Sequence, residues 1–377
     1  MVLIYNHIET MNNSFGKLVS ISIFGESHGC IVGCLVDGCP SSLPLYNNEV
    51  QQELERRKPG KSAYVSQRSE KDLVKILSGV FNNKTTGSPI TLVIENTDCR
   101  SNDYFNLKET FRPGHADYTY AQKYRNRDYR GGGRASARVT AAVVAGGAVS
   151  KKWLRLKHGS QVKGYLSELK EIKIPFIHWT YVNNNCFFSP NISIINTLTK
   201  QLRLLIKAGN SVGSRLALIM SKIPIGIGEP LFNKLDASIA CGLMSLNAVK
   251  DVEIGSGYLS SSKTGLELND ALTPEGFLSN HSGGILGGIS TGSDVIVFIA
   301  IKPTSSISLF KRSVSDSNRP TYVRTKGRHD PCIGIRAVPV AEAIVSVIIM
   351  DFILQTHFSE DYQNSNCHLV HPKAYLY

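Results

Sequence analysis

The sequence lacks the features that mark several specialised classes of protein. Its 377 residues contain no uninterrupted apolar run of the roughly 18 residues that a membrane span needs. The nearest candidate, residues 338–354, is broken by Glu342, Ser346 and Asp351. Residues 1–12 have no basic start and do not resemble a secretory signal. No repeat, low-complexity tract or obvious linker is present, so no domain boundary is visible.

Paired cysteine motifs are also missing. The chain has eight cysteines, but none forms a CxxC pair, and no histidine follows at the spacing of a zinc site. We therefore predict no metal site. We interpret the neighbouring Cys30, Cys34 and Cys39 as reduced, buried apolar residues, which indicates a reducing, cytosolic compartment.

The composition is that of a globular protein with a basic surplus. An apolar fraction of 42% and a charged fraction of 19% exclude a wholly disordered or collagen-like chain. The net charge of +12 suits an anionic partner, such as nucleic acid, a membrane surface or a phosphorylated or carboxylated small molecule. A biased genome rich in Lys and Asn would produce the same bulk charge, so local charge clusters have to decide between these readings.

Hydrophobic periodicity predicts both strands and helices. Expected strands cover residues 18–24, 31–36, 90–94, 216–223 and 295–301. Expected helices cover residues 49–58 after an Asn48 cap, 194–205, 235–246, and the two interior segments 134–149 and 338–354. The glycine-flanked loop 25–29 joins the first two strands as a hairpin. Helices that are apolar on most sides need cover on most sides, so we predict an α+β fold with a helical layer between two antiparallel sheets.

The densest charge cluster is residues 111–138. It contains seven arginine and lysine residues, against Asp117 and Asp128. Three glycines, 131–133, precede a small-residue helix, and this arrangement suits phosphate binding by backbone N–H groups. The segment matches neither GxxxxGK[ST] nor GxGxxG. The alternative is a flexible, solvated basic loop.

Two histidines lie in short loops that suit proton transfer. His115 follows Pro113 and Gly114, and Asp117 would orient its imidazole. His28 lies in the loop 25–29. Segments 280–292, 302–306 and 326–336 offer further glycines, hydroxyls and cations. For each of these segments the alternative is an ordinary surface turn.

Six segments together resemble the chorismate synthase family. They are GESHG (25–29), RPGHAD (112–117), DYRGGGR (128–134), GGILGGIS (283–290), KPTS (302–305) and GRHDP (327–331). They occur in the order and at the spacing of the bacterial form, from about residue 13 to residue 354. This range would be a single domain, with an N-terminal extension over 1–12 and a polar C-terminal tail over 355–377. Met11 is an alternative start.

The resemblance implies a specific reaction. The enzyme would eliminate phosphate from 5-enolpyruvylshikimate 3-phosphate in an anti-1,4 sense to give chorismate, the last common step to the aromatic amino acids. Reduced FMN would be required without net redox change, supplied by an external reductant, and NADPH would act at most indirectly. The fold would be a β-α-β sandwich, and the chain a cytoplasmic homotetramer without nucleic-acid or membrane partners.

The resemblance also assigns roles to individual residues. His115 would hold a proton near the flavin, His28 would assist departure of the phosphate, and Asp330 would help to set the protonation of the flavin. FMN would be contacted by Arg134, Ala135, Ser136, Asn247, Ala248, Gly287, Lys302, Pro303, Thr304, Ser305, Ser306 and Arg328. The anionic groups of the substrate would be held by Arg57, Arg112, Arg138 and Arg336, and Arg57 also matches a position associated with NADPH.

The chain departs from the family pattern at three positions. Ala63 stands where many relatives have arginine, which weakens the expected contact with NADPH. Asn210 and Leu266 replace an acidic and a small polar residue and are expected only to adjust loops. Two other functions remain open at this point: binding of single-stranded nucleic acid by the arginine- and tyrosine-rich segment 118–138, and a different flavin enzyme on the same scaffold.

Overall fold

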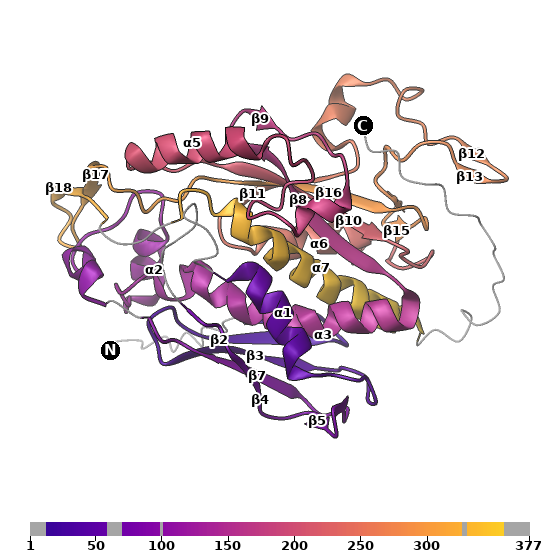
Figure 1. Ribbon diagram of the computed structural model, residues 1–377, viewed down its shortest axis with the longest axis horizontal. Helices are drawn as coiled ribbons and strands as arrows, with labels where there is room; N and C mark the ends of the chain where they lie inside the picture. Colours follow the sequence, from indigo (N-terminus) through magenta and orange to yellow (C-terminus); the bar gives the residue numbers. More distant parts are fainter. Residues whose placement is uncertain (1–12, 59–69, 99–100, 326–329, 358–377) are drawn as a thin grey trace, which may run out of the picture.

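The computed structural model describes residues 13–58, 70–98, 101–325 and 330–357. Two five-stranded antiparallel sheets and a set of helices make up most of this part of the chain (Figure 1). The mixed α+β class predicted from the sequence is confirmed. The predicted extension 1–12 lies outside the described residues.

The first sheet is built from the N-terminal third of the chain. Its strand order is β1 (Ser14–Phe15), β2 (Ser20–Gly25), β3 (Ile31–Asp37), β7 (Ile90–Glu95) and β4 (Val74–Ile76). Along β7 the side chains of Ile90, Leu92 and Ile94 are fully buried, while the residues between them are more exposed. This alternation of period two is what a strand covered on one face requires. The hairpin predicted around residues 25–29 is confirmed by the antiparallel pairing of β2 with β3.

The second sheet is built from the C-terminal half. Its strand order is β11 (Val249–Ile254), β16 (Val295–Ile301), β10 (Ser214–Ser221), β8 (Gln161–Leu169) and β9 (Ile172–Lys173). Strand β10 is almost entirely buried, because it pairs with a strand on each side and packs under a helix. The predicted strands at 216–223 and 295–301 are confirmed, whereas β8 and β11 were not predicted.

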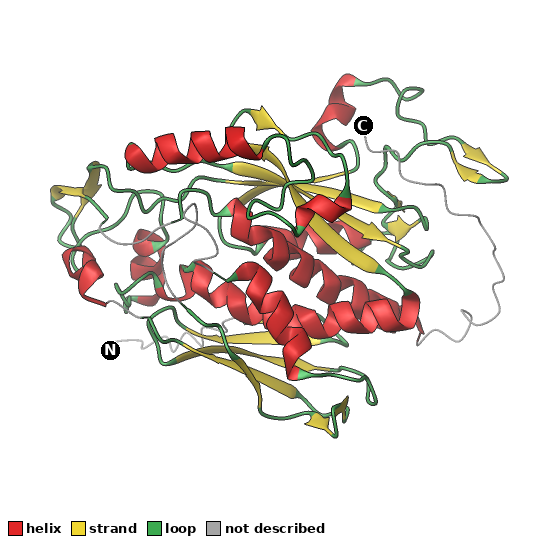
Figure 2. Ribbon diagram, in the orientation of Figure 1, coloured by secondary structure: helices red, strands yellow, loops and turns green. Residues whose placement is uncertain are grey.

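Helices pack on each of the two sheets (Figures 1 and 2). They are α1 (Asn47–Arg57), α3 (Thr140–His158), α6 (Leu235–Met244) and α7 (Gly334–His357). Helix α3 packs on β3, helix α7 packs on β8 and β10, and the two helices pack extensively against each other. Helix α5 (Ile195–Lys207) buries Leu198 and Leu202.

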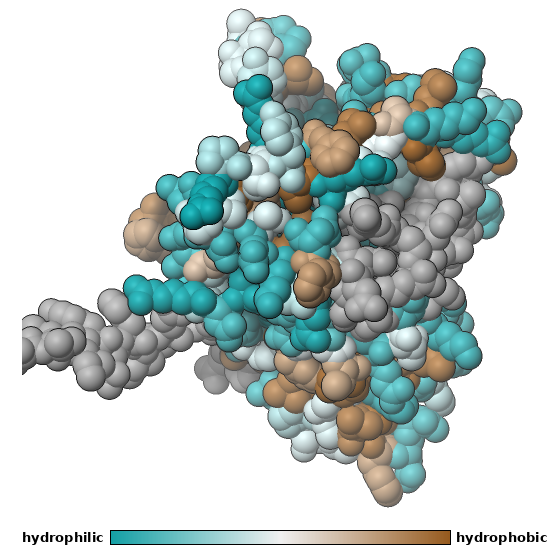
Figure 3. Space-filling view, turned by 90° about the vertical axis from the view of Figure 1, so that its left-hand side faces the viewer, coloured by the Kyte–Doolittle hydropathy of each residue, from teal (hydrophilic) through white to brown (hydrophobic). Residues whose placement is uncertain are grey.

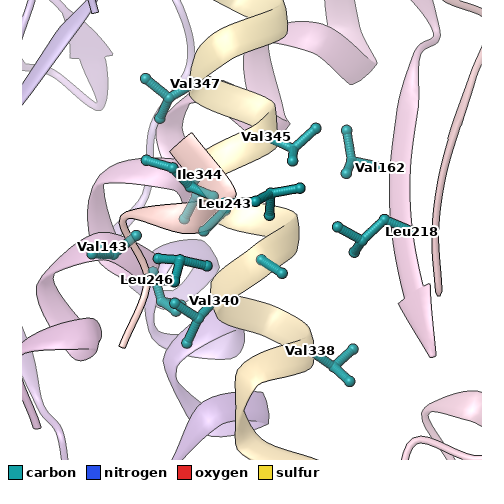
Figure 4. Packing of buried hydrophobic residues seen from close by; sticks show 14 of the residues in the cluster. Val143, Val162, Leu218, Leu243, Leu246, Val338, Val340, Ile344, Val345 and Val347 are labelled. Atoms are coloured by element: carbon teal, nitrogen blue, oxygen red, sulfur yellow. The ribbon is translucent and has the colours of Figure 1, made fainter. Parts of the chain in front are cut away.

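Small residues allow α3 and α7 to approach closely. A Cβ atom built on Gly147 of α3 would lie 2.4 Å from the Cβ of Ala343 in α7, a distance that real side chains do not reach. The Ala- and Gly-rich composition of this segment therefore allows the two helices to pack closely. Around α7, Val338 and Val345 face the strand residues Val162 and Leu218 (Figure 4).

Helix α7 is long and apolar enough to cross a membrane by length and composition. The most apolar 18 residues of the segment 334–356 have a mean hydropathy of 2.2, and 89% of them are buried inside the molecule. The helix is therefore a core element of this fold. Its last turn reaches His357, so it includes the first three residues of the predicted tail.

Three local predictions were wrong. Helix α1 begins at Asn47, with Tyr46 as the N-cap, so Asn48 lies inside the helix. Segment 134–149 does not start as a helix, because two short 3₁₀ turns, η2 (Gly133–Ala135) and η3 (Ala137–Val139), precede α3. Cys30 is exposed at the end of the hairpin loop, whereas Cys34 and Cys39 are buried as predicted.

Candidate functional site

A cavity of about 310 Å³ lies beside the starts of α3 and α7, and the loop that follows β16 forms part of its lining. Fourteen of the residues predicted from the sequence line it. They are Arg112, His115, Ala135, Ser136, Arg138, Asn247, Ala248, Lys302, Pro303, Thr304, Ser305, Ser306, Asp330 and Arg336. The chain therefore brings together segments that are more than 200 residues apart. The left-hand end of the molecule in Figure 1 carries α2 (Asp117–Tyr124) and the hairpin of β17 (Lys311–Val314) and β18 (Pro320–Val323). Hydrophilic residues predominate among the described residues on this face (Figure 3).

The cavity is strongly cationic. Its lining contains four permanent cations, Arg112, Arg138, Lys302 and Arg336, and a single carboxylate, Asp330. The starts of α3 and α7 add the positive ends of two helix dipoles. An arrangement of this kind favours a ligand with several negative charges.

The triple glycine separates the two predicted histidines. A Cβ atom on Gly131 would lie 2.1 Å from the imidazole of His28, and one on Gly132 would lie 2.9 Å from the imidazole of His115. Both glycines have positive φ angles, +64° and +103°. Only glycine combines this backbone conformation with so close an approach, so the turn holds both imidazoles near one another. The ring of His28 also packs edge-on against Tyr104, at a centroid distance of 5.1 Å.

Asp117 anchors the other side of the cavity. Its buried carboxylate accepts hydrogen bonds from the main-chain N, the Nε and the Nη2 of Arg112, at 3.0, 2.7 and 2.8 Å. The Nδ1 atom of His115 lies 2.8 Å from Oδ1 of the same carboxylate. This contact is too far off line for a regular hydrogen bond, so Nδ1 is a buried polar atom held by electrostatic attraction.

The charges around His115 favour its neutral form. Burial lowers its pKa, Asp117 raises it in part, and Arg112 and Lys302 lower it further. An anion bound among these cations would offset their effect and raise the pKa of His115. The imidazole is therefore placed to change its protonation state when an anion enters or leaves.

The loop after β16 supplies hydroxyls and a cation. Lys302 donates from Nζ to the carbonyl of Gly114 at 2.9 Å, and Thr304 donates to the carbonyl of Asp330 at 2.9 Å. Asn247 donates to the carbonyl of Ala135 at 2.6 Å, which ties the end of α6 to the turn before α3. Ala248 has a φ angle of +72°, a conformation that L-residues rarely adopt and that often occurs at functional sites.

Asp330 and Arg336 form an ion pair at the start of α7. Nη1 of Arg336 donates to Oδ2 of Asp330 at 2.7 Å, and both side chains are largely buried. Among the described residues of the lining, Asp330 is the only carboxylate, and its ion pair partly neutralises Arg336.

Four of the predicted residues that the structure describes do not line the cavity. His28 lies directly behind Gly131. Arg57 is fully buried behind the wall. The side chain of Arg134 donates to Asn13 at 2.9 Å and to the carbonyl of Gly25, away from the cavity. Gly287 lies at the exposed tip of the hairpin formed by β14 (Ile285–Leu286) and β15 (Ile289–Ser290). Arg328, like Ala63, lies outside the described residues.

Sequence reasoning missed Tyr104, Ile333 and Asp72. Tyr104 and Ile333 line the cavity, and Asp72 holds two arginines behind it. Tyr104 and Asp72 fall in irregular segments without periodicity or glycine, so no local signal marks them. The two departures that are described, Asn210 and Leu266, are also absent from the cavity lining, and Leu266 is 86% exposed.

A larger groove of about 600 Å³ lies elsewhere, between α1, α3 and β8. Three of the five cations in its described lining are paired with carboxylates. Arg56 and Lys151 both bind Glu53 and Glu342, and Lys152 binds Glu49. The described lining of the groove has three carboxylates against five cations, whereas the smaller cavity has one carboxylate against four cations, so the smaller cavity is the stronger candidate for an anion site. Within the described ranges no cluster of three or more His, Cys, Asp or Glu side chains is placed to hold a metal ion.

Comparison with known proteins gives one consistent result. A family model described as "Chorismate synthase" matches residues 19–354. Chorismate synthases of Paraburkholderia phymatum and of Burkholderia mallei (strain SAVP1) are each 55% identical over 343 residues, which cover 91% of this chain and 94% and 93% of those proteins. A solved structure described as "Crystal Structure of Chorismate Synthase" superposes with a TM-score of 0.71 at 27% identity, over 91% of this chain and 93% of that one.

Proposed function

Because this chain belongs to the chorismate synthase family of lyases, we propose that it converts 5-enolpyruvylshikimate 3-phosphate into chorismate and phosphate by a 1,4-elimination. The observation that carries this proposal is the cavity lined by four cations and one carboxylate, with a histidine on each side of a triple-glycine turn. The substrate carries one phosphate and two carboxylates, so its charge complements the lining.

The arginines of the cavity would hold the substrate. Arg112, Arg138 and Arg336 present planar guanidinium groups, which match carboxylate and phosphate oxygens better than a lysine does. Negative charge builds up on the phosphate as the C–O bond breaks. Fixed cations therefore stabilise the transition state more than the ground state, which is how an electrostatic site accelerates a reaction.

The residues of the cavity also fit reduced FMN. Lys302 and the hydroxyls of Thr304, Ser305 and Ser306 suit a phosphate group, and the small side chains of the turn before α3 leave room for a planar ring. The volume of about 310 Å³ falls at the lower end of the range for cofactor sites. When bound, reduced FMN supplies the electron-rich ring that makes loss of the C–H hydrogen feasible without net oxidation.

The titratable residues of the site would have separate roles in proton transfer. His28, next to Gly131, would donate to the departing phosphate, and His115 would hold a proton near the flavin. Asp330, paired with Arg336, would help to set the protonation of the flavin. Gly287, Arg134 and Arg328 stay as proposed FMN contacts on the sequence resemblance alone.

The wider setting follows from the same resemblance. The layer order, with α3 against one sheet and α7 against the other, supports a β-α-β sandwich. Large exposed apolar side chains such as Phe232 and Leu266, 83% and 86% exposed, support assembly into a homotetramer. The enzyme would work in the cytoplasm with FMN reduced by an external system. The full burial of Arg57 argues against direct contact with NADPH, which would act only as an indirect reductant.

The histidine roles are tested with two substitutions and a matched control. We expect His28→Ala and His115→Ala each to lower turnover far more than FMN affinity. His178→Ala, an exposed histidine that caps α4 (Trp179–Val182), should leave both unchanged. Turnover is followed by chorismate absorbance under anaerobic conditions, and FMN affinity by titration. Unchanged turnover in both site variants would overturn the assignment.

A further inference from the structure

A buried carboxylate lies behind the cavity wall, where no catalytic group is expected. The side chain of Asp72 is 0% exposed and is absent from the cavity lining. The residue has a φ angle of +49°, and aspartate is one of the few residues other than glycine that tolerate this conformation. Any effect of Asp72 on a ligand in the cavity is therefore exerted through the groups that it binds.

Those groups are two arginines. Oδ2 of Asp72 accepts from Nη1 of Arg57 at 3.0 Å, and Oδ1 accepts from Nη1 of Arg138. Arg138 lines the cavity, and its remaining donors bind Oδ1 of Asn96 at 2.6 Å and the carbonyl of Glu95 at 3.1 Å. Every nitrogen of this guanidinium thus has a fixed acceptor behind the wall.

Arg57 carries the connection to a second cavity residue. Its Nη2 donates to the carbonyl of Ala137 at 2.6 Å and its Nε to Oγ1 of Thr140 at 3.3 Å. Its own main-chain carbonyl accepts from Nε of Arg336 at 3.2 Å. Asp72 therefore binds Arg138 directly. It is linked to Arg336 through Arg57, whose side chain it binds and whose main-chain carbonyl accepts from Arg336.

We propose that Asp72 and Arg57 are a positioning pair that holds the guanidinium groups of Arg138 and Arg336 in place for the anionic substrate. The proposal rests on the proposed function for the identity of that substrate. Arginine has several rotatable bonds, and a group fixed before binding loses less entropy when the ligand arrives. On this account Arg57 does not contact the ligand, in contrast to the role that the sequence resemblance gives it.

The charge balance explains why a carboxylate is needed so close to an anion site. Burial and the neighbouring Arg336 and Arg138 lower the pKa of Arg57 to about 9, and Asp72 and Asp330 oppose them. Without Asp72, three guanidinium groups would lie close together in a buried region, and among the described residues only Asp330, paired with Arg336, would offset their charge. Repulsion would then move Arg138 and Arg336 from the positions seen here.

The last turn of α1 provides a matched control. Arg56 binds the buried Glu342 in the separate groove, as its neighbour Arg57 binds Asp72 behind the cavity. We expect Asp72→Asn to raise the KM for the enolpyruvyl substrate about tenfold or more, the loss typical of a charged hydrogen bond. FMN affinity should change less than about twofold. Both Asp72→Asn and Glu342→Gln should lower the melting temperature, because each removes a buried carboxylate that binds an arginine. Glu342→Gln should leave the KM and the FMN affinity unchanged. A KM that rises equally in both variants would overturn the positioning role.

A double variant separates positioning from charge compensation. Asp72→Asn with Arg57→Met removes both charges of the buried pair, a replacement that often preserves or improves stability. We expect the double variant to fold and still to show the raised KM. A KM equal to that of the wild type would show that the pair serves stability alone.

A crystal structure of the double variant tests the proposal without any activity. We expect the guanidinium of Arg138 or of Arg336 to be displaced or split into alternative conformers relative to the wild-type protein. If both stay in their wild-type positions, the proposal fails. If instead the wild-type protein forms no chorismate from substrate and reduced FMN, the proposed function fails, and the crystal structures still decide the positioning role.

Discussion

Replacing Asp117 by asparagine should impair both the stability and the chemistry of the site. The carboxylate binds Arg112 through three hydrogen bonds of 2.7 to 3.0 Å and lies 2.8 Å from Nδ1 of His115. Removing one partner of a buried ion pair costs about 3–5 kcal/mol, so we expect Asp117→Asn to lower the free energy of unfolding by about that amount. A misplaced Arg112 should lower kcat/KM by about 10- to 100-fold, the value of one charged hydrogen bond to the substrate.

The pH dependence distinguishes a catalytic effect from mere loss of stability. Asp117 raises the pKa of His115 against burial and the neighbouring cations. Without that carboxylate the pKa of His115 falls further, so the alkaline limb of the kcat profile, on which His115 loses the proton that it would hold, should move to lower pH. The assay is anaerobic chorismate formation across the pH range in which the variant stays folded.

Asp351→Asn is the control for this experiment. Asp351 is also buried and accepts hydrogen bonds from the main-chain N–H groups of residues 17–19, at 3.0, 2.7 and 2.9 Å. It does not line the cavity. We expect this variant to lose stability and keep the wild-type pH profile. If Asp117→Asn also keeps the wild-type profile, our account of how His115 is tuned is refuted.

Three further predictions follow from glycines and buried charges. Gly132→Ala should lower turnover at least about tenfold, because the new Cβ lies 2.9 Å from the imidazole of His115 and the positive φ adds strain; Gly265→Ala, which meets nothing within 4 Å, should be neutral in the same assay. Gly147→Leu should destabilise the fold by about 1–3 kcal/mol or more in chemical unfolding, because a Cβ there already lies 2.4 Å from α7. Burial raises the pKa of Glu342, but its cationic partners outweigh that effect and lower the pKa to about 2. The stability that the Glu342 carboxylate contributes is therefore complete above its usual pKa of 4.5 and is lost as the pH falls towards 2. An acid titration in which the wild type shows no such loss relative to Glu342→Gln would contradict this prediction.

Local sequence signals predicted the elements that have strong periodicity. The alternating segment 31–36 became β3, and the apolar segment 338–354 became most of α7. Strand β8 was missed because its burial pattern is irregular, with three consecutive buried residues and a register shift against β10. A pattern of period two cannot be recognised where the pairing itself is interrupted.

The site was predictable as a set of segments but not as a set of side-chain directions. The motifs around His115, Lys302 and Arg336 meet at one cavity. Arg134 belongs to the same motif as the triple glycine, yet its side chain turns towards Asn13, just before β1. Such directions depend on contacts between residues far apart in the chain. The same reason explains why the burial of Arg57 and the role of Asp72 had no signature in the sequence.

The most direct test of the account is an anaerobic assay of the purified protein with dithionite-reduced FMN and 5-enolpyruvylshikimate 3-phosphate. The account predicts the absorbance of chorismate and one phosphate released per chorismate formed, with no net consumption of reduced flavin. Absence of product with folded, FMN-bound protein, or stoichiometric oxidation of the flavin, would contradict it.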